Sequence, residues 1–289
     1  MKSMRYVGVD EPLSTEQGQI IRDRAVTAAR RQFVGRKLCP IGPILGEGAQ
    51  VFGYDTLTEV SDARIDDGWP GGESKDIVNL ARTTVSIPNI HSEFEINKLD
   101  LASSRLNGTP LNLSVVDSKS YKVALAEDAL IIEGWSRDGT TYEINGLYQG
   151  AGNNEASNLD YGTKANIETS VLNALALLEA DGIYPPFNMV MNPAQFAQTQ
   201  ALIANTSRSY IDWVREVIQG EVYQTPAITA GTGMIVKSNA EGMFEYVMAE
   251  DLSVFTEILP RSHNLYGKVY VRGLPVIYDS NAICKLTTI

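Results

Sequence analysis

Two long polar segments on either side of a Gly-Pro turn limit how this chain can fold. Residues from about 50 to 64 and from about 76 to 90 have the pattern of extended arms. Between them lies DDGWPGGES, in which Trp69 is followed by Pro70, Gly71 and Gly72, and these last three residues predict a turn. Both arms carry polar and charged side chains, so the hairpin is hard to bury within its own domain. Loops of this length commonly bind a partner, and the alternative is a mobile surface loop.

The composition is that of an ordinary globular protein with an acidic balance. Of 289 residues, 44% are hydrophobic and 20% are charged, and the formal net charge is −11. An acidic chain with a pI near 4.7 disfavours a freely exposed nucleic-acid binder, which needs a basic face. No apolar run is long enough to cross a bilayer, and the first residues lack the apolar stretch of a signal peptide. We therefore expect a cytoplasmic protein without a membrane partner, in which the widely separated Cys39 and Cys284 stay reduced.

The first predicted helix gathers positive charge in this acidic chain. Ser14 and Gln17 form a capping-box pattern, and Gly35 supplies a predicted stop. Apolar side chains recur at a helical period, namely Ile21, Ala25, Ala28, Ala29 and Phe33. Basic residues occupy mainly the other faces, namely Arg22, Arg24, Arg30 and Arg31, with Arg36 and Lys37 beyond the end. The charge indicates either a solvated helix whose late cations complement the helix dipole or a docking face.

Two further long helices and a run of strands complete the pattern. Apolar spacing predicts helices over about Leu111–Glu133 and Asn166–Ala180. FNMVM reads as a short buried strand, Asn192 and Pro193 begin a short helix, and Tyr210–Ile218 forms another. From Val222 onward strands dominate, in the segments MIVK, FEYVMA, SVFTEIL, KVYVRG, PVIYD and AICKL. This order predicts an α+β fold, since no βαβ alternation is present.

The sequence contains few patterns that are typical of catalytic or metal-binding sites. His91, Glu93 and Glu95 alternate onto one face of a strand, which favours a polar strand face over a metal site. The chain has no GxSxG, GxxxxGK[ST] or GxGxxG motif, and GAGNN and AGTGM are only fragments of Gly-rich turns. We expect no cofactor, no metal and no catalytic residue, and an unrelated α+β enzyme stays a remote alternative.

Several segments in collinear order together resemble the encapsulin shell proteins. They are PLSTEQGQIIRDRAVTAARRQFVGRKL, IGPILGEGAQ, VSIPNIHSEFEINKLDL, VVDSKSYKVALAEDALIIEG, LEADGI and EDLSVFTE. The chain departs from the family pattern near Gly18, where encapsulins usually carry a Trp. The resemblance spans nearly the entire chain, and its strength lies in the order of motifs that are individually weak.

The resemblance implies the fold of tailed-phage major capsid proteins, to which encapsulins are similar. That fold has a peripheral domain with a long spine helix, an apical domain and an extended loop. The implied boundaries are 1–50 for the N-terminal arm and helix, 51–90 for the extended loop, 91–137 with 243–289 for the peripheral domain, and 138–242 for the apical domain. The hairpin containing Trp69, Pro70, Gly71 and Gly72 would then be an intersubunit loop. Contacts with a neighbouring subunit would explain why its polar arms are hard to bury within their own domain.

The same resemblance gives the basic helix a role. In encapsulins the N-terminal helix lies on the interior side and helps to form the groove for a cargo protein's C-terminal peptide. If this carries over, Ile21, Ala25, Ala28 and Phe33 pack against the peripheral domain or add apolar surface to the groove. Arg24, Arg30 and Arg31 would face cargo or internal anions. The implied function is a non-enzymatic shell protein that self-assembles into an icosahedral compartment enclosing cargo, and the alternative is a viral capsid protein that encloses double-stranded DNA.

Overall fold

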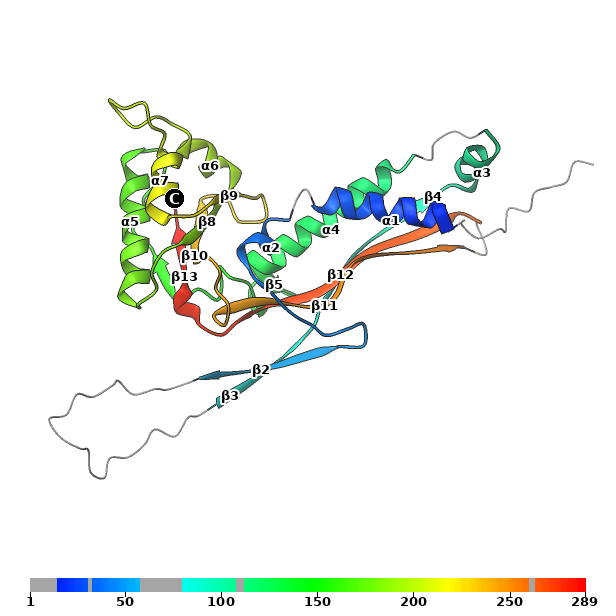
Figure 1. Ribbon diagram of the computed structural model, residues 1–289, viewed down its shortest axis with the longest axis horizontal. Helices are drawn as coiled ribbons and strands as arrows, with labels where there is room; N and C mark the ends of the chain where they lie inside the picture. Colours follow the sequence, from blue (N-terminus) through cyan, green and yellow to red (C-terminus); the bar gives the residue numbers. More distant parts are fainter. Residues whose placement is uncertain (1–14, 31–32, 58–79, 108–111, 260–262) are drawn as a thin grey trace, which may run out of the picture.

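The computed structural model describes residues 15–289 except 31–32, 58–79, 108–111 and 260–262. The described chain forms a four-stranded and a five-stranded sheet with helices packed on them, a small two-stranded hairpin, and a thin two-stranded arm that projects from the body below the four-stranded sheet (Figure 1). Helices and strands are mixed, and the described sheets are not built from repeated βαβ units, so the predicted α+β class is confirmed.

The first sheet is long and has the strand order β1-β11-β12-β4. Its strands are β1 (Ile41–Ile44), β11 (Phe244–Ile258), β12 (Leu265–Ile277) and β4 (Asn89–Ile96). The prediction of four separate strands between 244 and 279 was wrong, because pairing of β11 with β12 continues through irregularities between Met248 and Ser253. Such bulges bend a strand without ending it.

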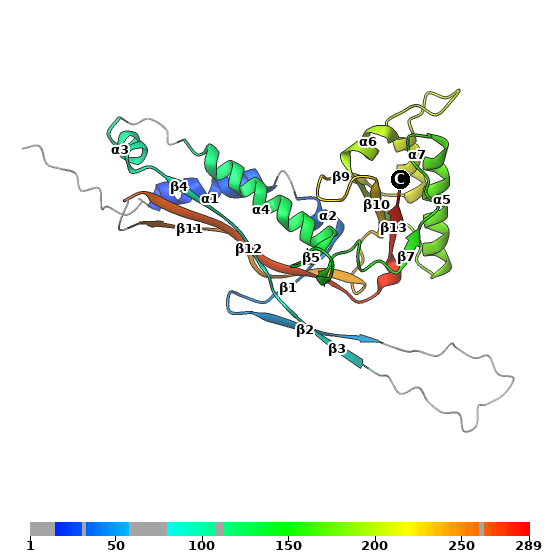
Figure 2. The same ribbon diagram turned by 180° about the vertical axis from the view of Figure 1, so that it is seen from behind.

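Two helices pack on one face of this sheet, as seen from opposite sides in Figures 1 and 2. They are α1 (Thr15–Arg30) and α4 (Ser114–Ile132), and the short α2 (Gly35–Leu38) packs on the end of α4. Gly35 therefore begins α2, and its predicted role as the stop of the first helix was wrong. Its role is steric: a Cβ at Gly35 would lie 2.9 Å from Cδ1 of Ile131, so glycine permits the close approach of α2 to α4.

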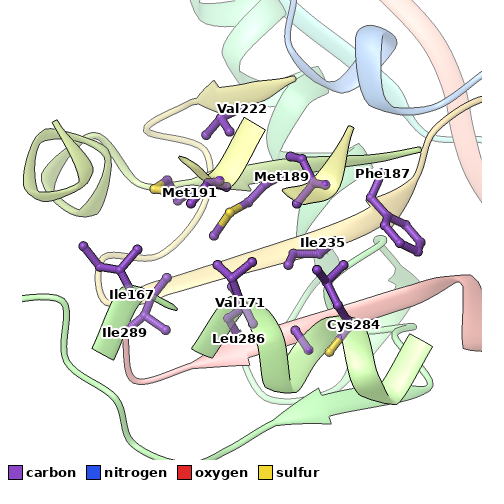
Figure 3. Packing of buried hydrophobic residues seen from close by; sticks show 14 of the residues in the cluster. Ile167, Val171, Phe187, Met189, Met191, Val222, Ile235, Cys284, Leu286 and Ile289 are labelled. Atoms are coloured by element: carbon purple, nitrogen blue, oxygen red, sulfur yellow. The ribbon is translucent and has the colours of Figure 1, made fainter. Parts of the chain in front are cut away.

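The second sheet contains five strands in the order β7-β13-β10-β8-β9. They are β7 (Asn153–Glu155), β13 (Ile283–Thr287), β10 (Thr232–Lys237), β8 (Phe187–Met191) and β9 (Val222–Gln224). One face packs against α5 (Ala165–Ala180) and α7 (Tyr210–Ile218), as Figure 3 shows for Val171, Ile235 and Leu286.

The central strands of this sheet are buried on both faces. Met189, Met191 and Ile235 face the α5 and α7 cluster, whereas Val190 and Met234 face a second cluster that includes Ile131 and Phe244. This burial explains why FNMVM is continuously apolar. The second cluster joins the five-stranded sheet to α4 and β11, so the two sheets and their helices share a hydrophobic core.

Most of the predicted helices are confirmed. The predicted spine helix is observed as α4, the helix predicted to begin at Asn166 begins at Ala165, and α7 has the predicted bounds. In α6 (Pro193–Thr199), Asn192 caps the helix by accepting a hydrogen bond of 3.1 Å from the amide of Ala194. Ser14 lies outside the described residues.

Some short elements had no clear sequence signal. They are α3 (Lys98–Asn107), β5 (Gly134–Ser136), β6 (Tyr142–Asn145) and the 3-10 turn Ser280–Ala282. The last strand, β13, pairs with β10 in the five-stranded sheet, although the predicted boundaries group it with the first sheet.

Candidate functional site

The N-terminal helix α1 packs along α4, and its apolar side chains are used for that packing. Ile21 is 1% exposed and belongs to the cluster between the helices and the first sheet, together with Ala25 and Val116. Phe33, which follows α1, is 9% exposed and packs with Ala29 and Ala124. Ile21 and Phe33 thus fix the position of α1, and neither offers much surface to a partner.

The arginines of α1 differ in whether a carboxylate pairs with them. Arg24 makes a two-pronged ion pair with Asp117 of α4, with Nη2 and Oδ2 2.8 Å apart. Arg30, in the last turn, and Arg22 are exposed, and neither has an ion-pair partner among the described residues. Arg31 lies outside the described residues. The exposed face of α1 therefore presents Arg22, Arg30 and the apolar Ile20, which is 58% exposed.

A buried ionic cluster fixes the chain just after α1. Arg36 binds the fully buried carboxylate of Glu127 on α4 with Nε and Nη2, and its Nη1 lies 2.8 Å from Oδ1 of Asp251 on β11. The guanidinium of Arg36 also lies 4.3 Å from the centre of the Phe33 ring. Burial raises the pKa of Glu127, and the positive charge of Arg36 opposes this shift. The cluster joins the segment after α1, the spine helix and the sheet.

Next to it, Asp128 holds the backbone of the same segment. Its Oδ1 accepts hydrogen bonds from the amides of Gly35 at 2.8 Å and Val34 at 3.1 Å. The apolar spacing predicts the helix that carries Glu127 and Asp128, but it does not predict a buried ionic cluster. The available signal was two adjacent acids inside an otherwise apolar helix face, together with the cations of GRK, because buried charges need partners.

The arm that projects from the body is a two-stranded ribbon of β2 (Val51–Leu57) and β3 (Leu80–Ser86). Its base packs on the face of the first sheet opposite the helices, where Phe52, Tyr54 and Val85 meet Val247, Leu274 and other residues of β11 and β12. Tyr54 contacts Tyr278 edge to face, with ring centroids 5.7 Å apart. Arg82 and Asp55 pair across the strands at 2.8 Å.

Beyond this base, the ribbon extends away from the body (Figures 1 and 2). Trp69, Pro70, Gly71 and Gly72, the predicted intersubunit residues, lie outside the described residues. Large apolar side chains are exposed where the arm leaves the body, namely Ile41 at 55%, Ile44 at 74% and Val51 at 50%. Exposed apolar groups of this kind are typical of a surface that contacts another protein.

The described residues offer little for catalysis or metal binding. Burial raises the pKa of the Cys284 thiol to about 12 and that of the Cys39 thiol far above its ordinary value, so both are poor nucleophiles at neutral pH. Within the described ranges, no three His, Cys, Asp or Glu side chains lie together as a metal would require. His91 lines an open cleft of about 920 Å³ between α4, the β3–β4 connection and the β5–β6 hairpin.

None of the helices in the described part of the chain has both the length and the apolar character needed to cross a membrane.

Comparison with known proteins agrees with this architecture. The family described as "Encapsulating protein for peroxidase" matches residues 8–264, which include the arm, α1, α4 and most of both sheets. The chain belongs to this encapsulin family. A relative, the type 1 encapsulin shell protein EncA of Myxococcus xanthus, is 26% identical over 279 residues, which are 96% of this chain and 94% of that protein.

Solved structures confirm the encapsulin and phage-capsid fold. The virus-like particle of Pyrococcus furiosus has a TM-score of 0.69 at 17% identity, covering 93% of this chain and 98% of that chain. The capsid of Myoviridae phage XM1 has a TM-score of 0.59 at 14% identity, covering 85% and 90%. The chain is therefore a self-assembling shell protein with a structural role, and its family favours the encapsulin interpretation over the viral one.

Proposed function

We propose that copies of this chain assemble into a closed icosahedral shell that encloses a protein cargo in the cytoplasm and catalyses no reaction itself. The first sheet with α1 and α4 forms the peripheral domain, and the five-stranded sheet with α5 to α7 forms the apical domain. In this division β13 belongs to the apical domain by its pairing with β10.

The observation that carries this proposal is the arm. A two-stranded ribbon is marginally stable in water unless something packs on it. Beyond the base at Phe52, Tyr54 and Val85, the described part of the chain supplies no third strand for either edge of the ribbon. A second copy can supply the missing contacts, and the exposed Ile41, Ile44 and Val51 extend the apolar surface beside it.

We place the exposed face of α1 on the inside of the shell, as the surface that meets cargo. This face is basic at Arg22 and Arg30 and apolar at Ile20, and it carries one exposed carboxylate, Asp23, which accepts a hydrogen bond from Gln19. A cargo peptide with acidic and apolar side chains would suit it. Arg24 contributes less than the sequence predicts, because Asp117 already satisfies its guanidinium.

Thiol labelling of assembled particles tests the inside placement. In an Arg30→Cys variant, a bulky polymer-linked maleimide should react slowly with intact particles and quickly after dissociation. A Ser207→Cys variant, on the exposed loop before α7, is the matched control and should react at the same rate in both states. The natural thiols add little background, because Cys39 and Cys284 are buried. Fast labelling of Arg30→Cys in intact particles would place α1 outside or at a pore.

The second candidate function, a capsid that packages double-stranded DNA, has support from the fold shared with phage XM1. The contents of purified particles separate the two. A specific protein with little nucleic acid supports the encapsulin function, and nuclease-protected DNA of uniform length supports the viral one.

A further inference from the structure

Asp128 and Glu127 are adjacent carboxylates inside the protein, with exposed fractions of 1% and 0%. The charged and titratable groups around them are few. Arg36 comes from α2, Tyr246 and Asp251 come from β11, and the Cys39 thiol lies beside Tyr246. Since Asp251 is largely exposed, one buried arginine faces two buried carboxylates.

Of the two buried carboxylates, Arg36 forms its ion pair with Glu127 and not with Asp128. Its Nε lies 2.9 Å from Oε1 and its Nη2 lies 3.2 Å from Oε2. Asp128 has no such cation within salt-bridge distance among the described residues. Its partners are backbone amides: Gly35 and Val34 both donate to Oδ1, and Val34 also lies 3.0 Å from Oδ2. Asp128 is therefore the carboxylate whose charge lacks a buried counter-charge.

We propose that Asp128 is a proton-operated latch that holds the segment after α1 against the spine helix. Oδ1 keeps the hydrogen bond from the Gly35 amide in either protonation state. The Val34 amide donates to both oxygens, so it keeps Oδ1 as acceptor when Oδ2 takes up the proton. The protonated side chain removes an uncompensated charge from the interior without releasing Gly35.

The direction of the effect follows from the two states of the latch. Burial raises the pKa of Asp128 in the closed segment to about 6, and the two amide bonds oppose this shift. In an opened segment the carboxylate is in water and regains an ordinary pKa near 3.8. The closed state thus binds the proton more tightly, so the extra stability of the closed state is full below about pH 3.8 and is lost as pH rises through about 6.

The latch bears on the position of α1. The segment that it holds contains Phe33, which packs on α4, and Arg36, which joins α4 to β11. Opening would release the C-terminal end of α1 from the body. The latch itself does not depend on the proposed function, and only its effect on an interior cargo surface rests on that proposal.

Hydrogen exchange of the full chain, read by mass spectrometry, tests the latch. Peptides covering residues 33–39 should exchange about 10-fold faster at about pH 8 than at about pH 5, after correction for intrinsic exchange, because the latch opens more often. Peptides from α5, which packs in the other core cluster, are the internal reference.

Asp128→Asn is the decisive variant, because the asparagine side chain keeps an oxygen acceptor, has the shape of the protonated aspartate and cannot ionise. It should keep residues 33–39 protected at both pH values. Asp251→Asn is the matched control: it removes the exposed carboxylate near Arg36 and should leave the pH dependence as in the natural chain.

Equal protection of residues 33–39 at both pH values in the natural chain would overturn the latch, as would a pH dependence that persists in Asp128→Asn. If Asp128→Asn does not fold, the natural chain alone decides the matter. Light scattering of the same samples records assembly separately, so failure to form a shell is distinguished from failure of the latch.

Discussion

Arg24 of α1 and Asp117 of α4 form a two-pronged ion pair, in which Nε donates to Oδ1 and Nη2 donates to Oδ2, each at 2.8 Å. Both side chains are partly in water, so the pair orients the helix more than it stabilises the fold. The pair ties the middle of α1 to α4, while Arg36 and Asp128 fix the chain beyond the C-terminal end of α1.

We predict that Arg24→Lys weakens the docking of α1 without unfolding the protein. Lysine keeps the charge but cannot make the two parallel hydrogen bonds. Hydrogen exchange in α1 should rise a few-fold, and the midpoint of urea unfolding should stay close to that of the natural chain. Arg22→Lys, on the exposed face of the same helix, is the control and should change neither quantity. Equal exchange in both variants would show that the ion pair does not hold the helix.

Phe94 of β4 lies over Gly267 of β12, its partner in register. A Cβ at Gly267 would be 2.1 Å from the Phe94 ring, far inside contact distance. We predict that Gly267→Ala lowers the free energy of unfolding by about 1–3 kcal/mol or more, because the ring must leave its rotamer.

A double-mutant cycle isolates this contact. Phe94→Ala alone should cost about 3–5 kcal/mol, since it removes a buried ring. Adding Gly267→Ala to Phe94→Ala should cost little, because the clash is gone. If the loss of unfolding free energy in the double variant, measured by chemical denaturation, equals the sum of the losses in the two single variants, a clash between a Cβ at residue 267 and the Phe94 ring is contradicted.

Glu133, at the end of α4, ties the spine helix to the loop before β10. Its Oε1 accepts hydrogen bonds from both the amide and the hydroxyl of Thr229, each at 2.6 Å. We predict that Glu133→Ala lowers the free energy of unfolding by about 1–2 kcal/mol, because the Thr229 donors lose a charged acceptor. Glu143→Ala is the matched control: this glutamate of β6 is exposed, and its ion-pair contact within the described part of the chain is a long one, with Arg137 at 3.6 Å. Equal losses of unfolding free energy in Glu133→Ala and Glu143→Ala would show that the hydrogen bonds between Glu133 and Thr229 do not specifically connect α4 to the loop before β10.

Shortening the arm should separate folding from assembly. Leu57 and Leu80 are register partners, so an Asn-Gly turn can replace residues 58–79 and close the ribbon directly. We predict that the shortened chain unfolds cooperatively with nearly unchanged stability but forms few or no closed particles. Particles of natural size and yield, measured by light scattering and microscopy, would show that residues 58–79 are not needed for contacts between copies.

Local sequence signals predicted the elements that local chemistry controls. The bounds of α7 follow from its cap, because the Ser209 hydroxyl accepts from the amide of Asp212. The cap of α6 at Asn192 has the same basis. The length of β11 did not follow, because the polar residues of EDLS resemble a break. Only pairing with β12 shows that the strand continues past Glu250.

The candidate surfaces were only partly predictable for the same reason. The helical period correctly placed Ile21, Ala25 and Ala29 on the buried face of α1. It could not show that Arg24 is already paired, because Asp117 lies 93 residues away in the chain. The role of Gly35 was missed because a glycine after a helix is usually a stop, whereas here it allows close packing against Ile131.

We propose that this chain encloses protein cargo in a closed shell, and the mass and contents of purified particles test this function. The measurement combines negative-stain microscopy and native mass determination with mass spectrometry and a nucleic-acid assay of the contents. Uniform closed particles of megadalton mass, built from this chain and holding a specific second protein, are the predicted result. A monomer or small oligomer at all concentrations would contradict the shell, and particles filled with DNA would contradict the protein cargo.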